Sequence, residues 1–286
     1  MTSQVRITAV AGRYARDKAV TLDAIRSSIR AARADGSELI VFPECALGGY
    51  LDPASDKPAH DRLPEPTDLD GAEIRRLAAA AGDAVVVVGC TEVAADGRVH
   101  STAVCLSGDG VLGTQRKVHI PAGEAGCFQP GDRFEAFDTP VGRVGMLVCY
   151  DKVFPEAARA LALDGAEIVA SPAAWPTCEV RPARRLRRDP QARQFDVLDA
   201  ARAVDNQIVW VSSNQAGAFG RRRFVGGSKV VDPHGAVLAG TGGRAGSAHA
   251  TVDLAAVAEA RKLYFHLADR RPDAYLAGLT PVALPA

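Results

Sequence analysis

The chain has 286 residues, 47% of them hydrophobic, which is enough to bury a full core as one large domain or two smaller ones. Its 34 basic and 34 acidic side chains give a formal net charge of zero, so no long-range field favours nucleic acid or an anionic membrane. No apolar stretch reaches the roughly 18 residues of a spanning helix, and the start of the chain lacks the pattern of a secretory signal. We therefore expect a soluble cytoplasmic protein without nucleic acid or membrane partners.

Strand-like and helix-like segments alternate from the N-terminus to residue 117. Apolar residues recur with helical spacing between 18 and 34, where Leu22, Ile25 and Ile29 share one face. Two later strand-like runs are separated by a Gly-rich turn at 107–110, which is typical of a β-hairpin. The predicted segments are strands at 5–11, 38–43, 84–88, 99–106 and 111–117 and helices at 18–34 and 71–81.

The alternation continues beyond residue 133. A turn at 232–235 joins two of the predicted antiparallel strands. The combination of hairpins with strand–helix units predicts an α/β protein with a mixed sheet rather than a doubly wound parallel one. The predicted segments are strands at 134–137, 144–148, 167–170, 208–212, 225–231, 236–239 and 247–252 and helices at 155–163 and 190–206.

Three of the apolar runs lead directly to a side chain that can ionise, namely Glu44, Lys117 and Cys149. The carboxyl ends of strands in α/β sheets commonly border a ligand crevice, so we expect a carboxylate, an ammonium and a thiol on one rim. Together they can do what none does alone. The carboxylate takes the thiol proton, the sulfur attacks a carbon, and the ammonium stabilises the oxyanion.

Most of the six cysteines are predicted to pack as small hydrophobes in the core. They form no C-x-x-C pair and no Cys/His spacing of a zinc site, so neither a disulfide framework nor a metal centre is expected. The four cysteines to which we give this packing role are Cys45, Cys90, Cys105 and Cys178.

Cys149 lies where an apolar strand stops and a helix is about to begin. Pro155 is well placed to open that helix, because proline at the first helical position sacrifices no hydrogen bond. Free N–H groups in such a turn can lower the pKa of a thiol and receive an oxyanion. Taken alone, however, its position at a strand end favours core packing.

Six segments resemble, in order and separation, the landmarks of the nitrilase superfamily, the carbon–nitrogen hydrolases. Three look like its signature segments: FPECALGGY at 42–50, RKVHIP at 116–121 and CYDKVFPEAARALALDGAEIV at 149–169. Three are similar to its downstream landmarks: SPAAW at 171–175, SSNQAG at 212–217 and FVGGSKVVDPHG at 224–235. The resemblance, which extends to about residue 250, implies a four-layer α-β-β-α sandwich with mixed sheets.

The resemblance also implies roles for the matching residues. Cys149 is expected to be the nucleophile, Glu44 the general base and Lys117 the group that holds the oxyanion. The family usually contributes a second glutamate six residues ahead of a Pro-Gly-Asp turn. With that turn at 130–132, the count gives Glu124, which would orient the substrate nitrogen and Lys117.

The reaction expected from these roles is acyl transfer to water, without a metal or organic cofactor. Glu44 deprotonates Cys149, and the thiolate attacks an amide or carbamoyl carbon. Lys117 and the N–H of Tyr150 hold the oxyanion, ammonia or an amine leaves, and water activated by Glu44 hydrolyses the thioester. Trp175 matches a position from which the family commonly lines its substrate pocket, with core packing as an equal alternative.

Two other functions stay open. Typical nitrilases follow the nucleophile with a tryptophan or glycine and then a glutamate, and they are usually longer. This chain has Tyr150 and Asp151, so an amidase or N-carbamoyl amidohydrolase is preferred over a nitrilase. A non-enzymatic binding protein on the same fold would not need three charged or reactive groups at strand ends. The expected partner is a small amide, ureide or nitrile, whose identity the pocket loops decide.

Two further segments suggest surfaces. The basic run from Arg181 to Arg188 is not accompanied by a nucleic-acid recognition fold, so we interpret it as a solvated loop. The alternative is that it forms an entrance to the site that recognises an anionic substrate. After a hydrolase domain at 1–263, the proline-broken tail 264–286 carries apolar residues that need a covering surface. Because the family pairs across one helical face, we expect a homodimer or higher homo-oligomer with this tail at the subunit interface.

Overall fold

The computed structural model describes residues 4–51 and 57–276, and most of its strands belong to two six-stranded sheets. The first sheet has the order β14-β1-β2-β3-β4-β5, with β1 (Gln4–Ala11), β2 (Leu39–Val41), β3 (Val85–Val93), β4 (Val99–Ser107), β5 (Gly110–Arg116) and β14 (Gly246–Asp253). The second has the order β13-β12-β9-β8-β7-β6, with β6 (Phe137–Thr139), β7 (Gly142–Met146), β8 (Ile168–Ala173), β9 (Val209–Asn214), β12 (Lys229–Val231) and β13 (Val237–Gly240).

Both sheets are mixed, as predicted. Parallel strands β1 to β3 form the middle of the first sheet, and parallel strands β7 to β9 form the middle of the second. Antiparallel strands flank each parallel group, and the predicted hairpin at 107–110 joins β4 to β5. A separate hairpin consists of β10 (Ala216–Phe219) and β11 (Arg222–Val225).

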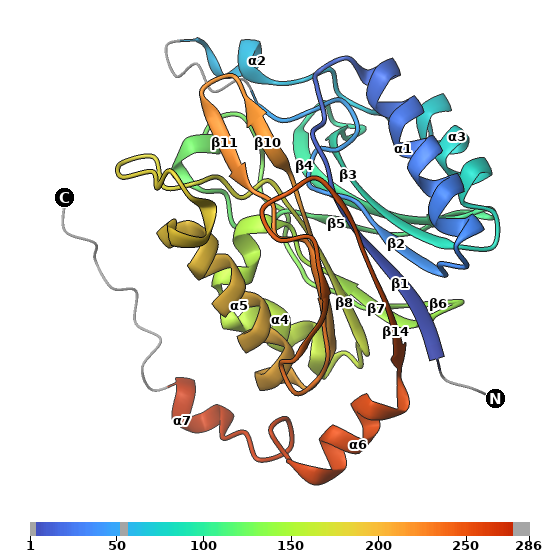
Figure 1. Ribbon diagram of the computed structural model, residues 1–286, viewed down its shortest axis with the longest axis vertical. Coiled ribbons are helices and arrows are strands. Elements are labelled where there is room, and N and C mark those ends of the chain that lie inside the picture. The colour runs from blue at the N-terminus through green and yellow to red at the C-terminus, as the bar shows by residue number, and fades with distance from the viewer. Residues whose placement is uncertain (1–3, 52–56, 277–286) are drawn as a thin grey trace.

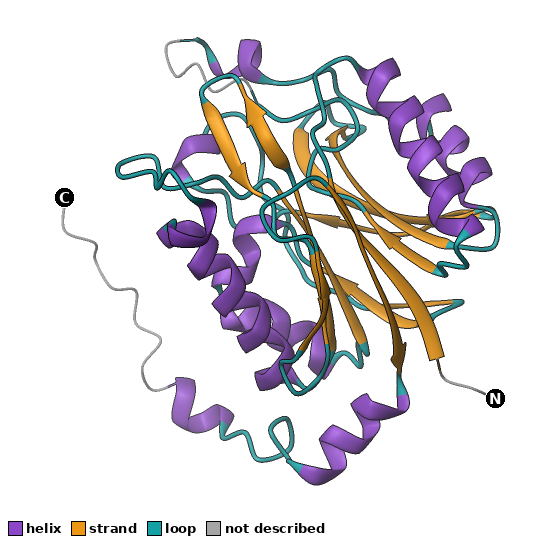
Figure 2. Cartoon of the chain, viewed as in Figure 1, coloured by secondary structure: helices purple, strands orange, loops and turns teal. Residues whose placement is uncertain are grey.

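The two sheets pack face to face, and helices cover their outer faces (Figure 1, Figure 2). In β2, Leu39 and Val41 lie in the core between the sheets, whereas Ile40 packs in the core beneath the helices. Successive side chains of a strand point to opposite faces, so a strand that is buried on both faces is apolar throughout. This explains why the central strands were predicted from continuous apolar runs.

The helices make the two outer layers. Helices α1 (Lys18–Ala34) and α3 (Ala72–Ala81) pack on the first sheet, and α4 (Pro155–Leu163) and α5 (Pro190–Asn206) pack on the second (Figure 1). The structure therefore confirms the four-layer α-β-β-α sandwich. Pro155 opens α4 at its first position, as predicted, and the Asp17 side chain caps α1 by accepting a hydrogen bond from the Val20 N–H.

Three predictions about local structure are wrong. The strand expected at 134–137 lies instead at Phe137–Thr139. The strand expected at 225–231 is broken into β11 and β12, because Gly226 and Gly227 adopt φ values of 65° and 77° that a strand cannot contain. Cys178, expected in the core, is only half-buried in the loop after β8, whereas the other three cysteines assigned to packing are buried.

The chain continues past β14 into α6 (Ala255–Leu263) and the short α7 (Pro272–Leu276), while α2 (Ala59–Arg62) lies on the opposite end of the molecule (Figure 1). Residues 277–286 of the predicted tail lie outside the described residues. Within the part of the chain that is described, no helix is long and apolar enough to cross a membrane.

Candidate active site

Glu44 lies on a tight turn beyond β2, because that strand already ends at Val41. The turn packs so closely on β3 that a Cβ atom at Gly89 would lie 2.5 Å from the Glu44 Cα, which excludes any larger residue there. The Leu47 N–H then donates to the Gly89 carbonyl at 3.0 Å. These contacts hold Glu44 in a fully buried position.

Cys149 begins the 3₁₀ turn η2 (Cys149–Val153) and has a φ of 51°, which a residue other than glycine rarely adopts. The buried Asp151 carboxylate fixes this turn by accepting hydrogen bonds from the N–H groups of Val148 at 3.1 Å and His119 at 2.8 Å. Nδ1 of His119 lies 2.8 Å from the same carboxylate, so this histidine is a local hydrogen-bonding partner. Strained backbone of this kind persists only where its surroundings fix it, and it is concentrated at active sites.

Lys117 follows β5 directly and joins two carboxylates. Its Nζ lies 2.9 Å from Oε1 of Glu44 and 2.8 and 2.7 Å from the two oxygens of Glu124, which ends the short 3₁₀ turn η1 (Ala122–Glu124). All three side chains are buried. The structure thus brings Glu44 together with Lys117 and Glu124, which come much later in the sequence.

Several supporting groups were not predicted from the sequence. The Ser101 hydroxyl donates to Oε1 of Glu44 at 3.0 Å, and the Ala174 N–H donates to Oε2 at 3.0 Å. The Tyr50 hydroxyl donates to the Glu124 carboxylate. Tyr50 and Ala174 lie inside segments that resemble family landmarks, which was the available signal, whereas Ser101 on β4 had none.

Burial and charge set the protonation of this cluster. Burial raises the pKa of the Cys149 thiol well above its usual value, and among the charged groups Glu44 raises it most. Burial lowers the pKa of Lys117, but Glu124 and Glu44 together raise it well above its usual range. Lys117 is therefore a permanent cation at neutral pH, and Cys149 keeps its proton until a base removes it.

A cavity of about 430 Å³ opens onto the cluster, and both Cys149 and Glu124 line it. Tyr150 and Trp175, predicted as substrate-binding residues, line the same cavity. Trp175 is also only 5% exposed, and its indole N–H donates to the Gln191 side chain at 2.8 Å, so packing and cavity lining occur together at this residue.

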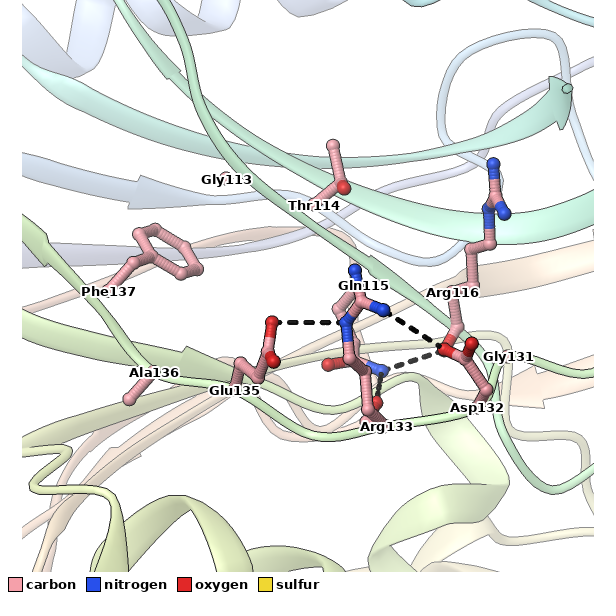
Figure 3. Close-up of a pocket in the computed structure, with 10 residues that line it drawn as sticks. All are labelled: Gly113, Thr114, Gln115, Arg116, Gly131, Asp132, Arg133, Glu135, Ala136 and Phe137. Carbon is pink, nitrogen blue, oxygen red and sulfur yellow. Dashed lines mark hydrogen bonds and ion pairs between the residues drawn. The ribbon is translucent and has the colours of Figure 1, made fainter. Parts of the chain in front are cut away.

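A second hollow, of about 400 Å³, lies beside β5 and the loop 131–137 and contains none of the predicted site residues (Figure 3). The Gln115 amide there donates to the carbonyls of Arg116 and Arg133 at 2.8 Å, and Arg133 pairs with Glu135 at 3.1 Å. Gln115, Arg133 and Glu135 are thus already engaged within the hollow, so we assign no chemistry to it. Across residues 4–51 and 57–276, no three His, Cys, Asp or Glu side chains group closely enough to hold a metal ion.

Comparison with known proteins gives matches along most of the chain. Residues 3–262 match a family model described as carbon–nitrogen hydrolase. An (R)-stereoselective amidase from Pseudomonas sp. is 33% identical over 271 residues, which cover 94% of this chain and 91% of that protein. An N-carbamoylputrescine amidase from Solanum lycopersicum is 31% identical over 274 residues, which cover 88% of this chain and 87% of that protein.

A solved structure is also similar. It is a variant of the amidase from Nesterenkonia sp. and shows covalent addition of the acetamide moiety of fluoroacetamide at the active site cysteine. The TM-score is 0.76 at 26% identity, and the match covers 96% of this chain and 97% of that chain.

Proposed function

The chain belongs to the carbon–nitrogen hydrolase family of the nitrilase superfamily, and on this premise we propose that it is a cysteine hydrolase of non-peptide C–N bonds that cleaves a small linear amide or N-carbamoyl compound. One observation carries the proposal. Lys117 joins the carboxylates of Glu44 and Glu124 in a buried cluster whose charges act on the Cys149 thiol.

Glu44 is the general base of the proposed reaction. The thiol keeps its proton at rest, so a base must take that proton as the sulfur attacks. Burial and Glu44 raise the pKa of this thiol, and the Glu44 carboxylate accepts a hydrogen bond from the N–H of Ala174, which lines the same cavity as Cys149. The sulfur bonds to the carbonyl carbon, and Lys117 and the N–H of Tyr150 stabilise the oxyanion. The C–N bond then breaks, and Glu44 returns the proton to the departing ammonia or amine.

The second half of the reaction releases the acyl group. Glu44 removes a proton from water, which attacks the thioester carbon, and the thiol of Cys149 leaves and is reprotonated. Glu124 acts as an orienting residue, because it holds Lys117 at 2.7 Å and is itself held by the Tyr50 hydroxyl. Tyr150 and Trp175 contribute to substrate binding from the cavity wall.

The proposal predicts which bond the protein cleaves. Purified protein incubated with linear amides, N-carbamoyl compounds and the matching nitriles should release ammonia from one of the first two classes, as measured by an enzyme-coupled ammonia assay. Turnover confined to nitriles would contradict the amidase assignment. The absence of any turnover or covalent adduct over the whole panel would favour a binding protein on the same fold.

We also propose that the hydrolase domain spans residues 1–263 and that the tail lies at the interface of a homodimer or a higher homo-oligomer. Three apolar tail residues, Tyr264, Phe265 and Tyr275, are 53%, 56% and 51% exposed in the single chain. Exposed apolar side chains that are grouped in one segment are typical of an interaction surface, and a second copy of the chain can cover them.

Replacing Tyr264 and Phe265 with serine should weaken association, because it removes apolar contact area without changing the catalytic cluster. Light scattering at micromolar concentration should then show a lower mass for the variant than for the full chain. Val180→Ser is the control, since it alters an apolar residue of a surface loop that is even more exposed, at 87%. A stable monomer for the unaltered chain at that concentration would refute the assembly proposal.

A further inference from the structure

A hollow lined by arginines adjoins the catalytic cavity. It measures about 540 Å³ and shares Glu179 and Arg222 with the cavity that contains Cys149. Arg221 and Arg223 also line it, and among the described residues that line it only Glu179 is acidic. The approach to the nucleophile is therefore positively charged, although the chain as a whole is neutral.

Arg222 has a hydrogen-bonding edge that the protein leaves largely unused. The side chain is 14% exposed, and its buried Nε atom has no hydrogen-bond partner among the described residues. Nη2, on the same edge, lies 3.5 Å from a carboxylate oxygen of Glu179, whose side chain is 70% exposed. A long ion pair with so exposed a partner contributes little, so it does not occupy this edge firmly.

We infer that Arg222 binds a carboxylate of the substrate at the end remote from the scissile C–N bond. The substrate class would then be a small amide or N-carbamoyl compound with an anionic terminus, and this inference rests on the proposed function. The spacing of the Nε and Nη2 donors matches that of the two oxygens of a carboxylate. A substrate carboxylate would take the place of Glu179 at Nη2 and would accept a hydrogen bond from the unpartnered Nε. Val153, Trp175 and Pro176 line the cavity and suit an aliphatic chain between the two ends.

The test compares amides that differ in terminal charge. Glutaramate is anionic, 5-oxohexanamide replaces one carboxylate oxygen with a methyl group, and 5-aminopentanamide is cationic. The unaltered protein should have its highest kcat/KM with glutaramate or with a shorter or longer homologue of it. Arg222→Gln should lower this kcat/KM about 10- to 100-fold and change that of 5-oxohexanamide less than about threefold. Arg222→Lys should restore only part of the loss, because an ammonium lacks the fork.

Arg223→Gln is the matched control, since this exposed neighbour lines the hollow but not the catalytic cavity. It should leave the preference for glutaramate intact. An equal loss of kcat/KM for glutaramate in both variants would mean that the arginines act through their summed charge and not through direct contact by Arg222, which would overturn the inference. Arg222 also lies 5.5 Å from the Tyr50 ring, so a structural role through Tyr50 would lower kcat/KM equally for the charged and neutral amides. That result would overturn the inference.

The preference of the unaltered protein separates this inference from the proposed function. Faster turnover of neutral or cationic amides than of every anionic homologue would overturn the role of Arg222 and leave the hydrolase assignment standing. Failure to hydrolyse any amide or N-carbamoyl compound would instead count against the proposed function itself.

Discussion

Cys149→Ala should abolish turnover, with a fall in kcat on the order of 10⁶-fold, as when a catalytic nucleophile is removed from another hydrolase. Neither Glu44 nor Lys117 can replace the sulfur as the atom that bonds to the acyl carbon. The fold should persist, because the substitution removes a single buried sulfur atom and little apolar area. Ammonia release and thermal unfolding of the purified variant measure the two effects separately.

Cys178→Ala is the matched control for this prediction. Cys178 is half-buried in a loop and does not line the cavity that contains Cys149, so its variant should keep both activity and stability. More than a trace of activity in Cys149→Ala would refute the nucleophile assignment. Loss of activity without unfolding in Cys178→Ala would show that the wrong cysteine had been chosen.

Lys117→Met should have the second largest effect on the rate and should also lower stability. Removal of one oxyanion donor typically lowers kcat by about 10²- to 10³-fold. The substitution also leaves the buried carboxylates of Glu44 and Glu124 without their shared cation, and breaking a buried ion pair costs about 3–5 kcal/mol of unfolding free energy. Urea unfolding at constant pH measures this loss.

The stability loss in Lys117→Met should depend on pH in a defined direction. Burial already raises the pKa of Glu124, and Lys117 opposes that rise, so its removal raises the pKa of Glu124 further. A carboxyl group with a raised folded-state pKa destabilises the protein as pH rises above its unfolded value, near 4.5. The gap in unfolding free energy between variant and parent should therefore narrow as pH falls from 7 to 5.

Lys117→Arg should keep the charge without restoring the rate. The guanidinium fork is larger than an ammonium and is aimed at planar partners, and the site around Lys117 is fully buried. Lys262→Arg, at an exposed position of α6, controls for the substitution itself. A near-normal rate in Lys117→Arg would show that only the charge matters at this position.

The sequence predicted individual elements better than their arrangement. The bounds of α1, α4 and α5 agree with the prediction. Leu22, Ile25 and Ile29 define one face of α1, and Pro155 marks the start of α4. The pairing of β14 with β1 joins residues 246–253 to residues 4–11, and no local pattern encodes such a distant contact. The glycine pair at 226–227 breaks a strand through its φ values, which apolar periodicity does not report.

The candidate site was predictable only in part. The apolar runs indicated Glu44 and Lys117, but the hydroxyl groups of Tyr50 and Ser101 reach the cluster through tertiary contacts. Lys152 is a further example, because a lysine in sequence suggests a solvated side chain. Here it is fully buried, with Nζ 2.6 Å from the Asp199 carboxylate of α5, and it anchors the turn η2 that begins at Cys149.

Mass spectrometry of the intact protein during incubation with amides, N-carbamoyl compounds and nitriles tests the central claim most directly. The account predicts a mass increase equal to an acyl or carbamoyl group, located by peptide mapping at Cys149 and lost as water completes turnover. The same incubation should leave Cys149→Ala unmodified. Steady turnover with no adduct at Cys149, or with the adduct on another side chain, would contradict the covalent mechanism.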